Sequence, residues 1–94
     1  MALARVVSFE GVGNDRIEEL RREITDGGPP EGMSPTEILV LHDSRAEKAL
    51  VVVFFESEDE YKRGDEVLGA MPAGEVPGQR TSVDKYEVAI RTTM

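Results

Sequence analysis

Three side chains in this sequence are candidates for chemistry: Arg5, His42 and Tyr86. In a pocket, the single histidine would act as an acid–base group or an axial haem ligand, but we favour an exposed position at the end of a strand. Tyr86 would place a phenol in a cleft, although such a ring more often packs with its hydroxyl group at the surface. Arg5 interrupts an apolar strand face, where a charge must be paired or must meet an anion. We expect Glu87 to pair with it, in preference to a ligand.

These three residues are therefore the predicted ligand-binding set, and only His42 and Tyr86 are candidates for catalysis. No arrangement of nucleophile, base and orienting group can be assembled from them. The acidic residues between 56 and 60 lack the spacing of a calcium loop, and three of them suit the start of a helix, which stabilises negative charge. Gly11-Val12-Gly13 is an incomplete phosphate-binding fingerprint. We therefore predict neither a metal site nor a cofactor.

Composition narrows the class of protein. A chain of 94 residues predicts a single domain, 1–94, and the absence of cysteine excludes disulfides and thiolate metal sites. The net charge is −8, and the 11 basic residues are scattered among 19 acidic ones, which argues against nucleic-acid binding. The N-terminus lacks the layout of a signal peptide, and no apolar run has membrane-spanning length. We therefore expect a soluble cytoplasmic protein that does not bind membranes.

The segment 48–56 is the element around which the rest is arranged. Seven consecutive apolar residues stand between Lys48 and Glu56, and five of them are β-branched or aromatic, which favours a strand. Alternate residues of a strand point to opposite faces, so both faces of this one are apolar and both need cover. Burial of each large apolar side chain contributes roughly 1.5–3 kcal/mol.

Three further strands are predicted, at residues 2–10, 36–43 and 83–91. The short polar segment before Lys48 suits a hairpin into the apolar strand. The last strand alternates charged and apolar residues, which is typical of an edge strand.

Two helices are predicted between the strands. Asn14 is the expected N-cap of the first, which ends at Gly27-Gly28-Pro29-Pro30. Ser57 and Glu60 form a capping box at the start of the second, which ends at Pro72. Gly64 lies on the apolar stripe of this second helix, where it would permit close approach to the sheet.

The resulting order, β-α-β-β-α-β, predicts a ferredoxin-like α+β fold. Its four-stranded antiparallel sheet carries two helices on one face, with the first and third strands in the centre. Two helices cover only one face, so the apolar residues on the other face predict a homodimer that packs sheet against sheet.

The segment Val53-Phe54-Phe55-Glu56-Ser57-Glu58-Asp59-Glu60-Tyr61, which runs from strand into helix, and the closing Tyr86-Glu87-Val88-Ala89 resemble the dimeric α+β barrel superfamily. This superfamily includes antibiotic-biosynthesis monooxygenase-like proteins, haem-degrading enzymes, isomerases and small proteins without assigned activity. The resemblance implies a barrel formed across a dimer and a ligand cleft between the sheet and the helices. Related enzymes use Trp, Asn and His in their pockets, but this chain has no Trp, and its Asn14 and His42 do not match those motifs.

Three functions follow as hypotheses. The first is a homodimeric protein that binds a small apolar or aromatic molecule between sheet and helices. The second is a cofactor-independent monooxygenase-like or isomerase-like enzyme, which requires Arg5, His42 and Tyr86 to converge in one cavity. The third is an amino-acid-binding regulatory module of the ACT type, a family that shares the element order and a glycine-containing turn after the first strand.

Overall fold

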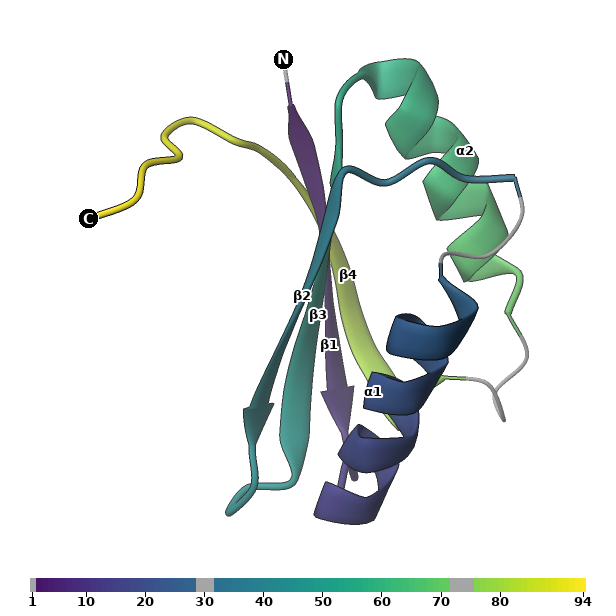
Figure 1. The fold of residues 1–94 in the computed structure, drawn as a ribbon, viewed down its shortest axis with the longest axis vertical. Helices are drawn as coiled ribbons and strands as arrows, with labels where there is room; N and C mark the ends of the chain where they lie inside the picture. The colour runs from purple at the N-terminus through teal and green to yellow at the C-terminus, as the bar shows by residue number, and fades with distance from the viewer. Residues whose placement is uncertain (1, 29–31, 72–75) are drawn as a thin grey trace.

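A computed structural model of the chain describes residues 2–28, 32–71 and 76–94. Two helices lie on one side of a four-stranded antiparallel sheet, in the order β-α-β-β-α-β (Figure 1). This confirms the predicted ferredoxin-like layout. The elements are β1 (Leu3–Glu10), α1 (Asn14–Gly27), β2 (Glu37–Asp43), β3 (Lys48–Phe55), α2 (Glu58–Gly69) and β4 (Gln79–Glu87).

The strands are arranged in the order β2-β3-β1-β4, so β1 and β3 occupy the centre as predicted. Val53 of β3 lies opposite Arg5 of β1 and Ile38 of β2, which places these three residues on the same face of the sheet. The helices cover this face (Figure 1). The alternate residues of β3, among them Leu50 and Phe54, therefore belong to the outer face.

The core lies between the sheet and the helices. Below α2, Phe55 and Val53 pack with Leu3 and Tyr61, and all four are buried. A second cluster forms around Val12, Val7, Phe9 and Ala49. The core therefore joins β1 and β3 to α2 at one end of the sheet, and to the turn after β1 at the other.

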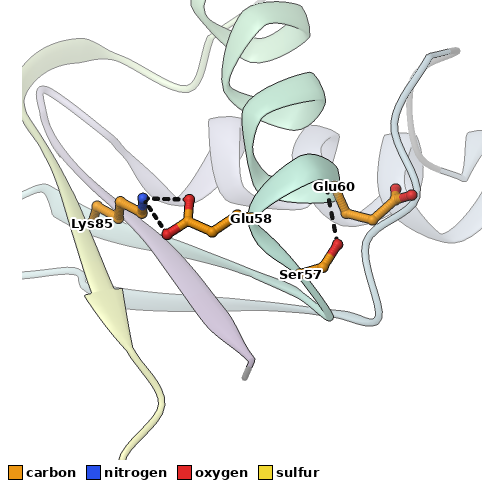
Figure 2. Close-up of polar contacts among 4 residues, drawn as sticks. All are labelled: Ser57, Glu58, Glu60 and Lys85. Atoms are coloured by element: carbon orange, nitrogen blue, oxygen red, sulfur yellow. Dashed lines mark hydrogen bonds and ion pairs between the residues drawn. The ribbon is translucent and has the colours of Figure 1, made fainter.

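Helix α2 begins as predicted. The Oγ atom of Ser57 accepts a hydrogen bond from the backbone N–H of Glu60 at 3.3 Å, which satisfies one of the free donors of the first turn (Figure 2). The helix ends at Gly69, before the expected stop at Pro72, which lies outside the described residues. Met71 is half-buried beyond the end of the helix.

The start of α1 differs from the prediction. Gly13, not Asn14, is the N-cap residue, and no side chain caps the helix. Gly13 has an extended backbone, with φ −85° and ψ 172°, and its carbonyl accepts from the N–H of Ile17 at 3.2 Å. Asn14 is therefore already the first helical residue. At the other end the N–H of Gly28 donates to the carbonyl of Ile24, while Pro29 and Pro30 of the predicted stop lie outside the described residues.

The last strand lies four residues nearer the N-terminus than the predicted strand. β4 begins at Gln79 and ends at Glu87, whereas the apolar alternation had suggested residues 83–91. The polar start of β4 pairs with β1 through backbone hydrogen bonds, which require no apolar side chain. β4 ends at Glu87, opposite Leu3, because β1 begins there, and Ile90 beyond it is 86% exposed.

The C-terminal segment leaves β4 on the side of the sheet away from the helices (Figure 1). Arg91 forms an ion pair with Glu37 of β2, and its guanidinium carbon lies 4.6 Å from the ring centroid of Phe54. The segment therefore reaches from β4 at one edge to β2 at the other.

Candidate functional site

A cavity of about 440 Å³ lies between the helix-facing side of the sheet and the helices. Its volume falls within the usual range of small-molecule sites, roughly 300–1,000 Å³. Strands β1 and β3 form its floor, and α1 and the segment before β2 contribute walls. Its lining is mainly apolar and includes Val7, Val51, Leu20, Ile24, Met33 and Ile38.

The polar groups of this cavity are few, and most have partners. Glu37 is paired with Arg91, and Glu23 lies 3.5 Å from a guanidinium nitrogen of Arg16. The hydroxyl of Thr36 donates to the carbonyl of Phe54 at 3.3 Å. The two remaining charged residues that the structure describes in the lining are arginines, Arg5 and the exposed Arg80.

Arg5 is buried on the floor of the cavity, with 4% of its surface exposed. Its Nε atom donates to Oδ1 of Asp65 at 2.9 Å, so the expected pairing with Glu87 is wrong. Glu87 lies opposite Leu3 in the register, and the neighbour of Arg5 on β4 is Lys85. The acid comes instead from α2, which is the helix that lies close over β1 and β3.

His42 lies beside a second cavity, of about 470 Å³, between α1 and β2. The side chain is half-buried, whereas the sequence analysis predicts an exposed position. Its Nε2 atom donates to the carbonyl of Val12 at 2.8 Å, because a carbonyl can only accept. In the neutral ring this leaves Nδ1 as the free acceptor. The two cavities share Leu20, Ile24 and Ile38 and are therefore neighbours along α1.

Tyr86 belongs to the opposite face of the sheet. It pairs with Ala4, whose neighbours Leu3 and Arg5 face the helices, and it is 57% exposed. The three residues singled out in the sequence are thus divided among two cavities and the outer face. The structure does not bring His42 and Tyr86 together as a catalytic pair.

A cluster of polar and aromatic groups at the start of α2 was not found from the sequence. The Nζ atom of Lys85 on β4 donates to both carboxylate oxygens of Glu58, at 2.7 and 2.9 Å (Figure 2). The same Nζ atom lies 5.0 Å from the ring centroid of Tyr61, and that ring meets Phe55 edge-on at 5.7 Å. No sequence pattern joins these residues, because they come from β4, α2 and β3.

The cluster changes the acidity of two of its members. Burial raises the pKa of Tyr61 above its usual value of 10.0, and the negative charge of Asp65 raises it further. The positive charges of Arg5 and Lys85 oppose this change in the pKa of Tyr61. The hydrogen bond to Glu58 raises the pKa of Lys85 above 10.5. Both groups are therefore protonated at neutral pH. The contacts of Lys85 with Glu58 and Tyr61 join β4 to α2. Neither Tyr61 nor Lys85 lines either of the two cavities.

Two other kinds of functional element were sought in the part of the chain that the structure describes. Across residues 2–28, 32–71 and 76–94, no group of three or more His, Asp or Glu side chains is placed to hold a metal ion. Neither described helix combines the length and apolar character needed to cross a membrane. The apolar cavity with Arg5 on its floor is therefore the candidate site.

Comparison with known proteins finds no relative of this chain. The sequence matches no family model and no curated protein, and no solved structure matches the fold. The site is therefore interpreted from its own geometry.

Proposed function

We propose that the protein binds a small apolar or aromatic molecule in the cavity between its sheet and helices. The observation that carries the proposal is the cavity of about 440 Å³, with its mainly apolar lining. Such a space, with a few polar groups at defined positions, is the common form of a small-molecule site. In the described part of the lining, Glu23, Glu37 and Thr36 are already engaged by other residues, and Arg5 is engaged by Asp65 through Nε alone.

The proposal is tested by filling the cavity. Octan-1-ol and naphthalene are suitable neutral probes, and their binding is followed by the chemical shifts of backbone amides in nuclear magnetic resonance titrations. We expect saturable shifts at the cavity residues. Ile38→Trp places a large ring in the lining and should abolish them, because Ile38 lies on the wall and is 40% exposed.

Val83→Trp is the matched control. Val83 has a similar exposure of 42% on β4 but lines neither cavity, so this variant should bind the probes as the wild type does. The absence of saturable shifts in the wild type, or equal binding by Ile38→Trp, would contradict the proposal.

We also propose that the outer face of the sheet pairs with a second copy of the chain, in the manner of a dimeric α+β barrel. Leu39, Leu41, Leu50 and Tyr86 support this, because they share that face and are each at least 36% exposed. Contiguous apolar surface of this kind marks interaction sites in soluble proteins. A second copy presents the same face, which makes the contact self-complementary.

Sedimentation velocity over a range of concentrations tests the dimer. Leu41→Asp places a charge on the outer face and should convert a dimer to a monomer. Val83→Asp introduces the same charge at a similarly exposed residue of the other face and should leave the dimer intact. A wild type that sediments as a monomer at every concentration, or a dimer unaffected by Leu41→Asp, contradicts this proposal.

We do not extend the proposal to catalysis. An oxygenase-like or isomerase-like reaction requires reacting groups in one cavity, but His42 and Tyr86 lie on opposite faces of the sheet. An ACT-like module would join subunits edge to edge, and the Leu41→Asp variant separates that arrangement from face-to-face pairing.

A further inference from the structure

We propose that the ligand of the cavity is a carboxylate, namely a carboxylic acid with an apolar or aromatic tail, and that Arg5 binds its head group. This inference rests on the proposed function and specifies the chemical class of the ligand. It assigns Arg5 a role that the ion pair with Asp65 leaves open.

The first argument is the incomplete hydrogen bonding of Arg5. Its side chain is 5% exposed, yet its hydrogen bond to Asp65 uses only Nε. Within the described residues, neither Nη atom has a hydrogen-bond partner. A guanidinium has five N–H donors in a rigid fork, and the bond to Asp65 uses only the one on Nε. The donors on the two Nη atoms are therefore available to an acceptor.

The second argument is that Arg5 lines the cavity itself. Neither Nη atom is both fully buried and without a partner. Because Arg5 is a lining residue, the proposal places the acceptor in the cavity. A planar carboxylate matches the guanidinium fork with two parallel hydrogen bonds, which a hydroxyl group cannot do.

The third argument is the charge around the cavity. The two acids in the described part of the lining, Glu23 and Glu37, lie beside arginines that do not line it, Arg16 and Arg91. Asp65, the partner of Arg5, is half-exposed, so water screens its charge. Among the described residues of the lining, an anion entering the cavity thus meets Arg5 without an unpaired carboxylate.

The fourth argument separates a carboxylate from a more highly charged head group. Arg5 is the sole buried cation in the described part of the lining, since Arg80 is exposed. One buried guanidinium, which Asp65 already shares, suits at most a single further negative charge, whereas a phosphate dianion needs several donors and cations. The remaining lining is mainly apolar and fits the tail.

The test compares octanoate with octan-1-ol, which have the same tail length but differ in charge. Isothermal titration calorimetry at pH 7 should give octanoate an affinity about tenfold to one-hundredfold higher, the gain expected for hydrogen bonds to a charged group. Arg5→Met keeps an unbranched side chain without the charge and should remove this preference. Arg63→Met makes the same change on the exposed side of α2 and should retain it.

The outcomes separate this inference from the proposed function. Equal affinity for the acid and the alcohol overturns the carboxylate while leaving the binding of apolar molecules in place. Saturable binding of neither probe overturns both proposals. An octanoate preference that survives in Arg5→Met overturns the role of Arg5.

A second variant keeps the test decisive if Arg5→Met does not fold. Asp65→Asn retains Arg5 and removes the competing charge of its partner, while Asp65 itself does not line the cavity. This variant should bind octanoate severalfold more tightly than the wild type and octan-1-ol with unchanged affinity. Unchanged or weaker octanoate binding by Asp65→Asn overturns the inference.

Discussion

The ring of Phe55 on β3 occupies the space that a side chain at Gly64 on α2 would need. A Cβ atom at position 64 would overlap the Cζ and Cε1 atoms of this ring, which is fully buried. We therefore expect Gly64→Ala to lower the free energy of unfolding. Alanine favours a helix by about 1 kcal/mol over glycine, but overpacking a core costs about 1–3 kcal/mol. Urea denaturation measures the net loss.

Gly69→Ala is the matched control for this prediction. Gly69 belongs to the same helix, and no atom lies within 4 Å of where its Cβ would be. The substitution should be neutral or slightly stabilising there. Equal effects at positions 64 and 69 would show that helix propensity, and not the Phe55 ring, determines the result.

The cap at Ser57 leads to a second prediction. Ser57→Ala removes the acceptor for the N–H of Glu60 and should lower the free energy of unfolding by about 0.5–2 kcal/mol. Ser57→Asn retains a capping oxygen and should recover most of the loss. Ser44→Ala, in the exposed turn between β2 and β3, serves as the control and should change stability little. Similar losses from the two alanine variants would argue against the cap.

The acidity of Tyr61 gives a third prediction. Tyr86→Phe leaves Tyr61 as the single tyrosine, so its ionisation can be followed by absorbance near 295 nm. The titration midpoint should lie above 10.0 in the folded protein and return to about 10 in urea. Lys85→Met should raise the midpoint further, whereas Asp65→Asn should lower it, because their charges have opposite effects on the pKa of Tyr61. A midpoint that does not respond to either change would contradict the charge cluster.

The same cluster predicts how stability depends on pH. The folded-state pKa values of Tyr61 and Lys85 lie above their unfolded values of 10.0 and 10.5, so the folded state holds these protons more tightly. Their contribution is fully present below about pH 10 and is lost as the pH rises through the folded-state values. The urea midpoint should therefore be constant up to about pH 10 and fall as the pH rises further. Glu58→Gln replaces the charged acceptor that raises the pKa of Lys85 with a neutral one and should make the fall shallower.

Asp65 provides a prediction that links stability to the ligand. Asp65→Asn leaves the buried Arg5 without a charged partner and should lower the free energy of unfolding by about 1 kcal/mol, since Asp65 is half-exposed. Octanoate should raise the melting temperature of this variant more than that of the wild type, and octan-1-ol should not. Glu66→Gln, which makes the same change of charge on the next residue of α2, is the control. A gain from octanoate that is equal in Asp65→Asn and the wild type would count against a carboxylate at Arg5.

Features that depend on local patterns were predictable from the sequence. They are the element order, the two faces of β3 and the cap at Ser57. Apolar periodicity shows which residues of β3 face each way, and Ser57 and Glu60 act within one helical turn. Gly64 was also placed correctly, since a glycine on an apolar helical stripe indicates close packing.

The partner of Arg5 was not predictable in this way. Its choice of Asp65 over Glu87 depends on how α2 crosses β1, and no short-range pattern specifies that crossing. The start of β4 was missed because its polar residues pair through the backbone. The cavity, finally, depends on how far α1 lies from the sheet, which segments distant in sequence determine together.

The position of α1 has a consequence for the exchange of its backbone protons with solvent. None of its side chains is fully buried and no side chain caps its N-terminus, whereas α2 buries Tyr61 and has a side-chain cap. Local opening is easiest where few apolar groups are buried, so the amides of α1 should exchange with deuterium faster than those of α2. Of the two helices, the one that forms a wall of the cavity thus has less to hold it closed. Transient separation of α1 would give the proposed ligand a route into the cavity while the sheet and α2 stay intact.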